Sequence, residues 1–159
     1  MPELMQTQVD STGRLSNNAV DSWVDNGCLL IEDFISKRAC EALLLTIDRL
    51  VEAFEPDDVK TVFSTTSQVH AAANYFERSG DKIRFFFEDG ALDSAGQLTC
   101  AKERALNKIG HALHDLDPGF ERFSYNPRLA VLAGQLGLAD PLLLQSMVIF
   151  KQPRIGGEV

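Results

Sequence analysis

Apolar residues recur every three or four positions in several stretches of the chain, a spacing that predicts amphipathic helices. The clearest stretch begins after Ser36, whose hydroxyl suits an N-cap, and ends before Pro56, because proline disfavours helical geometry in the residue before it. Its apolar face consists of Cys40, Leu43, Leu44, Ile47, Leu50, Val51 and Phe54. A shorter helix is predicted from Ser16 or Asn17 to Gly27, which provides the C-terminal stop.

Further helices are predicted along the rest of the chain. Residues 67–78 are compatible with a helix, and residues 102–115 place their apolar side chains on one helical face. Pro118 and Pro127 each stand where a first helical turn accepts proline. These two prolines predict short helices over about 118–124 and 127–136.

Strands are predicted where apolar or β-branched residues form short runs or alternate with polar ones. The runs are residues 28–31, 60–65, 82–88 and 142–151. The third run places Ile83, Phe85 and Phe87 on one side of a strand and Arg84, Phe86 and Glu88 on the other.

The order of these elements predicts an α+β fold with one domain over residues 16–159. Residues 1–15 have no apolar period and are predicted to be a poorly ordered lead-in. The strand predicted at 142–151 has no later strand with which to pair, so we expect the sheet to be incomplete at the C-terminus.

Charge and composition exclude several classes of partner. The 15 Lys and Arg residues against 23 Asp and Glu give a net charge of −8, which argues against nonspecific binding to nucleic acid or to an anionic membrane. No apolar run approaches the length of a membrane span. The three cysteines form no Cys-x-x-Cys pair, and no leader pattern is present, so we expect a reducing, cytoplasmic setting.

Four segments together resemble one protein family. They are Asn26–Ser36 (NGCLLIEDFIS), Ser79–Glu88 (SGDKIRFFFE), Asn107–His114 (NKIGHALH) and Gln145–Pro153 (QSMVIFKQP), the last followed by Gly156–Val159 (GGEV). In order and spacing they resemble the N-terminal half of the phytanoyl-CoA dioxygenase family, a branch of the Fe(II)- and 2-oxoglutarate-dependent oxygenases. The resemblance covers residues 16 to 159.

The resemblance implies N-terminal helices followed by the first strands of a double-stranded β-helix, or jelly roll. It also implies iron held by a His-x-Asp pair and a distal histidine, a ligand set that leaves positions open for the 2-oxo acid and dioxygen. None of His70, His111 and His114 begins a His-x-Asp sequence, and the family's pair follows the Gly-Gly-Glu-Val segment, so the iron ligands would lie beyond Val159. We therefore expect Fe(II) and 2-oxoglutarate in the complete protein and no stable binding of either to this chain alone.

Two residues match cofactor-binding positions of the family. Lys108 matches a lysine that contacts 2-oxoglutarate, and Met147 matches a residue that lines the same site. An ammonium group suits a dianion because it offers charge and three donors. Without the resemblance, Lys108 is read as a solvated helix lysine and Met147 as part of a strand core.

The sequence thus predicts the N-terminal portion of a dioxygenase that oxidises a small organic substrate, an acyl-CoA or a related compound, with release of succinate and CO₂. The alternative is a truncated, iron-free product that acts at most as an interaction module. Asp21 and Ser22 break the N-terminal peroxisomal signal that would otherwise follow Arg14, and a peroxisomal signal at a later C-terminus stays open.

Other groupings have simpler interpretations. His111 and His114 could form a helical metal pair but lack a third ligand, so satisfied helix histidines are favoured. Cys40 is expected in the core, and the phenylalanines at 85–87 are expected to pack in the sheet rather than stack on nucleic acid bases. Arg84 is either a buried ion-pair partner or a residue near an active-site mouth.

Overall fold

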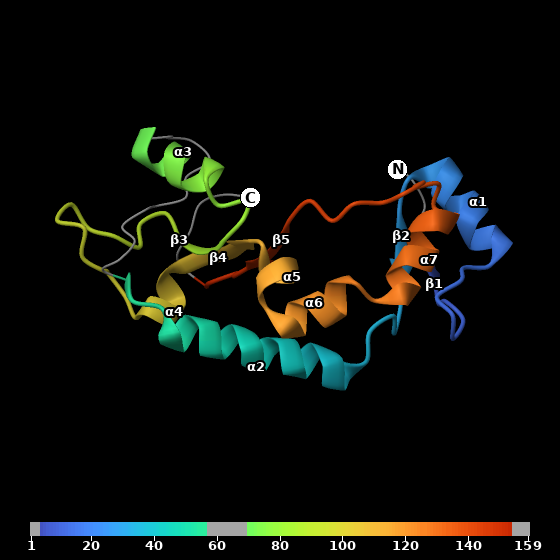
Figure 1. Ribbon diagram of the computed structural model, residues 1–159, viewed down its shortest axis with the longest axis horizontal. Helices are drawn as coiled ribbons and strands as arrows, with labels where there is room; N and C mark the ends of the chain where they lie inside the picture. Colours follow the sequence, from blue (N-terminus) through green and yellow to red (C-terminus); the bar gives the residue numbers. More distant parts are fainter. Residues whose placement is uncertain (1–3, 57–69, 154–159) are drawn as a thin grey trace.

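The computed structural model describes residues 4–56 and 70–153 and has helices together with two small sheets, which confirms the α+β class. The molecule is elongated, with a three-stranded sheet towards one end and a two-stranded sheet at the other (Figure 1). The helices are α1 (Asn17–Asn26), α2 (Lys37–Ala53), α3 (His70–Glu77), α4 (Lys102–Ala105), α5 (Leu113–Leu116), α6 (Pro118–Ser124) and α7 (Pro127–Gln135). The strands are β1 (Met5–Thr7), β2 (Leu29–Ile31), β3 (Ile83–Phe87), β4 (Leu106–His111) and β5 (Ser146–Ile149).

Local capping signals position four of the helices where the sequence predicts them. Ser16 and Ser36 accept hydrogen bonds from backbone N–H groups in the first turns of α1 and α2. Asp117 and Asn126 do the same for α6 and α7, each of which begins at a proline. No helix among the described residues has both the length and the apolar character that crossing a bilayer requires.

The single helix predicted over 102–115 is wrong, because the middle of this segment forms the central strand β4 between the short helices α4 and α5. A strand that is buried on both faces need not alternate apolar and polar residues, so its pattern can imitate a helical period. Gly110 allows β4 to pack closely on β5, because a Cβ at this position would lie 3.2 Å from the Cβ of Met147 on the neighbouring strand.

The strand predicted over 142–151 is shorter than expected. Only Ser146–Ile149 pairs with β4, and the side chains of Leu142 and Leu144 are each 82% exposed. Apolar content alone does not make a strand where no partner strand runs alongside. The strand predicted at 60–65 lies outside the described residues, and α3 covers the described part of the helix predicted at 67–78.

The poorly ordered lead-in predicted for residues 1–15 is corrected from Met5 onwards. Strand β1 pairs in parallel with β2, a contact between distant parts of the chain that no local pattern signals. Leu15 is buried, and its backbone N–H and C=O both bond to the Gln135 side chain on α7. Cys40 is exposed rather than in the core, and β2 is only half-buried.

The three-stranded sheet has the order β3-β4-β5, with antiparallel neighbours, and lies between α2 and α3 (Figure 1). One face packs on α2, α5 and α6 through a core that includes Val51, Phe54, Phe87, Ile109, Leu113 and Phe120. The opposite face carries Phe86 and Lys108 under α3. The two-sided arrangement predicted for residues 82–88 is thereby confirmed.

We expect Gly13→Ala to lower the free energy of unfolding by about 2–4 kcal/mol, because it combines backbone strain with a steric clash. Gly13 has φ 92°, and an added Cβ would lie 2.7 Å from the backbone oxygen of Arg128. Gly137→Ala is the matched control, since Gly137 has φ 89° with no atom within 4 Å of an added Cβ, and it should cost only about 1–2 kcal/mol. Urea unfolding measures both, and equal losses would contradict the close packing of this N-terminal segment.

Candidate functional site

Lys108 lies at the centre of β4, paired with Phe86 on β3 and Ile149 on β5. Its side chain is buried rather than solvated on a helix, with only 5% of the residue exposed. The ammonium nitrogen lies 4.6 Å from the ring centre of Phe76 on α3 and 5.2 Å from that of Phe86. The negative faces of these rings stabilise the cation in a place that water reaches poorly.

Burial lowers the pKa of the Lys108 ammonium to about 8, from an ordinary value of 10.5. At neutral pH the group therefore still carries its charge. A buried positive charge on a sheet face is costly to the fold and attracts anions strongly, because the surrounding dielectric is low. These properties are those of a group prepared to bind an anion.

We expect Lys108→Met to raise the free energy of unfolding at pH 7 by about 1–3 kcal/mol, because it removes a charge that folding must desolvate. The folded-state pKa lies below the unfolded-state one, so the wild-type chain gains stability as the pH rises from about 8 to 10.5. The advantage of the variant should shrink over that same interval. Urea unfolding at several pH values measures the difference, and a variant less stable than wild type at pH 7 would contradict this account of Lys108.

Met147 shares the face of Lys108. It pairs with Gly110 on β4, two residues after Lys108, and alternate residues of a strand point to the same side. The residue is 37% exposed, and Ile149 beside it is 53% exposed. The structure thus brings the two predicted cofactor-binding residues to one face, with the buried cation next to an apolar, partly open wall.

The His111 ring lies next to Lys108, although sequence reasoning assigned it no role beyond that of a satisfied helix histidine. The residue is 2% exposed, and its Nδ1 lies 2.7 Å from the Oγ of Ser79. Its ring packs against Phe76 and Phe86, the same two rings that Lys108 contacts. The lysine and histidine of the Asn107–His114 motif were the only sequence signal, and that motif does not indicate that both side chains contact Phe76 and Phe86.

His114 is held separately, at the start of α5. Its backbone N–H donates to the Oγ of Ser146 at 2.9 Å, and its Nδ1 lies 2.8 Å from the same oxygen. Its Nε2 lies 3.4 Å from the carboxylate of Asp115. The two histidines therefore have different serine partners, and within the described ranges no three His, Cys, Asp or Glu side chains are grouped as a metal site.

Arg84 ties α3 to β3. Its guanidinium stacks 4.3 Å from the ring centre of Tyr75 and donates a hydrogen bond to the backbone oxygen of the same residue. It also lines an open pocket of about 520 Å³ between the end of α2, α3 and the edge of β3. The partners of Arg84 are thus a ring and a backbone oxygen, in place of the buried ion pair that was the first of its two alternatives.

Comparison with known proteins shows a consistent set of relatives. A family model described as "Phytanoyl-CoA dioxygenase (PhyH)" matches residues 23–159. The chain is 43% identical over 148 residues to a phytanoyl-CoA dioxygenase of Arabidopsis thaliana, covering 93% of this chain and 52% of that protein. It is also 43% identical over 150 residues to phytanoyl-CoA dioxygenase domain-containing protein 1 of Danio rerio, covering 91% and 52%.

A more distant relative agrees. The homolog of phytanoyl-CoA dioxygenase domain-containing protein 1 in Dictyostelium discoideum is 37% identical over 146 residues, covering 92% of this chain and 52% of that protein. The chain therefore spans about half the length of the curated relatives it matches.

Proposed function

Because the chain belongs to the phytanoyl-CoA dioxygenase family, we propose that it forms the N-terminal part of an Fe(II)- and 2-oxoglutarate-dependent dioxygenase domain in which Lys108 binds 2-oxoglutarate. The observation that carries this proposal is the buried ammonium of Lys108, 5% exposed, on the sheet face that it shares with Met147. The sharpest test compares the 2-oxoglutarate dependence of wild type and Lys108 variants in a protein that also carries the C-terminal half of the relatives.

Lys108 suits this role through its charge and its surroundings. A compact ammonium forms charge-assisted hydrogen bonds with a carboxylate, and these bonds are strongest where water is excluded. The desolvation of Lys108 is already complete in the fold, and its rotation is restricted between Phe76 and Phe86. A carboxylate that approaches it meets a charge in a fixed place, which favours one orientation of the ligand.

Met147 and its neighbours would provide the wall of the same site. The methionine is flexible and apolar, so it can pack against the carbon chain of a small dicarboxylate and exclude water from the contact with Lys108. Phe76, near the C-terminal end of α3, contacts the ammonium through its ring and is 39% exposed. Displacement of this ring is the most direct way for an anion to reach Lys108.

The residues of this chain fit 2-oxoglutarate but not iron. None of the three histidines begins a His-x-Asp pair, and His111 and His114 each bond to a serine. We propose that the iron ligands come from the C-terminal half. Bound Fe(II) and 2-oxoglutarate would together supply the oxidising chemistry, with succinate and CO₂ as products, while the residues described here bind and orient the 2-oxo acid.

The remaining proposals follow from the same assignment. Strand β5 is an edge of the three-stranded sheet, and we propose that strands of the C-terminal half extend it into a jelly roll.

We propose a small organic substrate, an acyl-CoA or a related compound. No nucleic acid or membrane partner is proposed, because the chain has a net charge of −8. A cytoplasmic location is proposed from the three free cysteines.

A further inference from the structure

We propose that His111 is a second anion-contacting residue of the Lys108 site, and that it takes up a proton from solvent on Nε2 when a small dicarboxylate binds. The inference rests on the proposed function, because it concerns the same ligand at the same face. It assigns a role to a residue that the sequence analysis left without one.

The position of the ring proton on His111 follows from its serine partner. Ser79 is 1% exposed, and its hydroxyl donates its single proton to the backbone oxygen of Phe76. The Oγ of Ser79 can therefore only accept in its 2.7 Å contact with Nδ1 of His111, so Nδ1 carries the proton. In the neutral ring Nε2 then has a lone pair and no hydrogen.

Nε2 of His111 is buried and has no hydrogen-bond partner within residues 4–56 and 70–153. Buried polar atoms of this kind are rare in native structures, because each loses its bond to water without a replacement. A bound ligand that reaches this nitrogen would supply the missing partner. The rest of the imidazole is held in place, because Nδ1 is bonded to Ser79 and the ring packs against Phe76 and Phe86.

His111 and Lys108 act on one another. They contact the same rings, those of Phe76 and Phe86. Burial lowers the pKa of His111, and the positive charge of Lys108 lowers it further. In the free chain at neutral pH, Lys108 is therefore charged and His111 is neutral.

A dicarboxylate changes this balance. An ionised carboxylate only accepts hydrogen bonds, so it repels the bare lone pair of a neutral His111 and requires a donor there. Its negative charge also offsets that of Lys108, which removes one of the two causes that keep His111 neutral. Protonation of Nε2 gives the site two positive charges for a dianion and satisfies the buried nitrogen.

Three elements bring titratable side chains towards His111. On α3, Tyr75 packs on Phe86, and on β3, Arg84 stacks on Tyr75. The backbone oxygen of Lys82 accepts from the N–H of His111, while the Lys82 ammonium lies 3.4 Å from the carboxylate of Asp81. Strand β5 carries no titratable side chain over Ser146–Ile149. Lys108 is the group whose charge acts on His111.

His114 serves as an internal control with a different proton position. The carboxylate of Asp115, 3.4 Å from Nε2 of His114, favours a proton on that nitrogen, while Nδ1 of His114 contacts the hydroxyl of Ser146. The two buried histidines are thus expected to differ at Nε2.

The test is nitrogen NMR of the 159-residue chain labelled with ¹⁵N-histidine, with 2-oxoglutarate added into the millimolar range. In the free chain we expect His111 to be protonated on Nδ1 only, with no proton on Nε2. On addition of ligand, Nε2 of His111 should become protonated while His114 stays unchanged. Uptake of one proton should also weaken binding about tenfold for each pH unit of increase between the free and bound pKa values of His111.

Variants separate this inference from the proposed function. His111→Gln should bind 2-oxoglutarate with a flatter pH dependence, while Lys108→Gln should lose the binding itself. Binding that needs Lys108 but leaves His111 neutral would overturn the role of His111 and leave that of Lys108 intact. A free chain with a proton already on Nε2, or a ligand response that does not depend on Lys108, would overturn the inference as well.

Discussion

Lys108→Ala should raise the apparent constant for 2-oxoglutarate about 10- to 150-fold in a protein that carries the C-terminal half of the relatives. The variant removes one charge-assisted contact worth about 1.5–3 kcal/mol. Because the iron ligands would lie elsewhere, iron affinity should change little. Lys108→Arg should restore binding only in part, since a planar guanidinium presents its donors differently and must fit between two rings that now enclose an ammonium.

Lys82→Ala is the matched control for this experiment. Lys82 directly precedes β3, and its side chain is 51% exposed beside Asp81. Its removal should change the apparent constant for 2-oxoglutarate by an amount that corresponds to no more than about 0.5 kcal/mol, the usual range for a surface residue. Thermal melts of each variant identify folding defects, and an unchanged constant in Lys108→Ala would remove Lys108 from the site.

The second large effect concerns turnover. We expect the 159-residue chain alone to bind no Fe(II) at the family's site and to form no succinate from 2-oxoglutarate, whereas a version extended by the C-terminal half should do both. The physical reason is the ligand set, because a non-haem iron site of this kind needs two histidines and a carboxylate arranged on one side of the metal. Anaerobic iron titration coupled to a succinate assay measures the difference.

Two outcomes of that experiment would require a different account. Stoichiometric iron binding at micromolar concentrations, with succinate formation by the short chain, would mean that a metal site has gone unrecognised. An extended protein that is folded yet binds no iron would contradict the proposal that the C-terminal half provides the iron ligands.

Elements with local signals could be predicted from the sequence. Each of α1, α2, α6 and α7 has a side-chain cap one residue before its start, and two of them begin at a proline. The alternation in β3 likewise indicated which residues face the core. Such signals depend only on neighbours in the sequence, so they survive without knowledge of the fold.

Elements that depend on partners distant in the sequence could not be predicted from it. Strand β4 has an apolar spacing that fits a helix, and only its neighbours β3 and β5 make it extended. Strand β1 exists because it pairs with β2, more than twenty residues later. The strand predicted over 142–151 was too long, because Leu142 and Leu144 are apolar but lie outside β5 with exposed side chains.

The candidate site shows the same division. Lys108 and Met147 were identified through the family resemblance, and no pattern of spacing distinguished them from surface or core residues. Their common face depends on the pairing of Gly110 with Met147. His111 was missed because its environment comes from Ser79 and Phe76, which lie more than thirty residues earlier in the chain.

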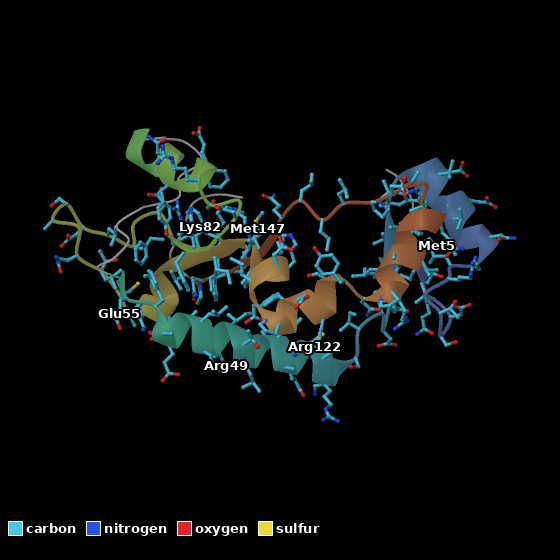
Figure 2. The ribbon with its side chains drawn as sticks, in the orientation of Figure 1. Met5, Arg49, Glu55, Lys82, Arg122 and Met147 are labelled. Carbon is cyan, nitrogen blue, oxygen red and sulfur yellow. The ribbon has the colours of Figure 1, made fainter. Side chains whose placement is uncertain are left out.

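The central claim, that the Lys108 face binds 2-oxoglutarate, is tested most directly by NMR of the chain with ¹³C-labelled methionine methyl groups. Met147 lies on the proposed face, near the middle of the molecule, and Met5 on β1 lies towards one end, away from that face, as an internal control (Figure 2). One or two charge-assisted contacts give about 1.5–6 kcal/mol, and the entropy cost of association offsets part of this, so binding to the chain alone should be weak, in the millimolar range or above. With added 2-oxoglutarate, we expect the Met147 methyl signal to shift progressively while that of Met5 stays in place, and Lys108→Gln to abolish the shift. A Met147 signal that does not move, or that moves equally in Lys108→Gln, would contradict the claim.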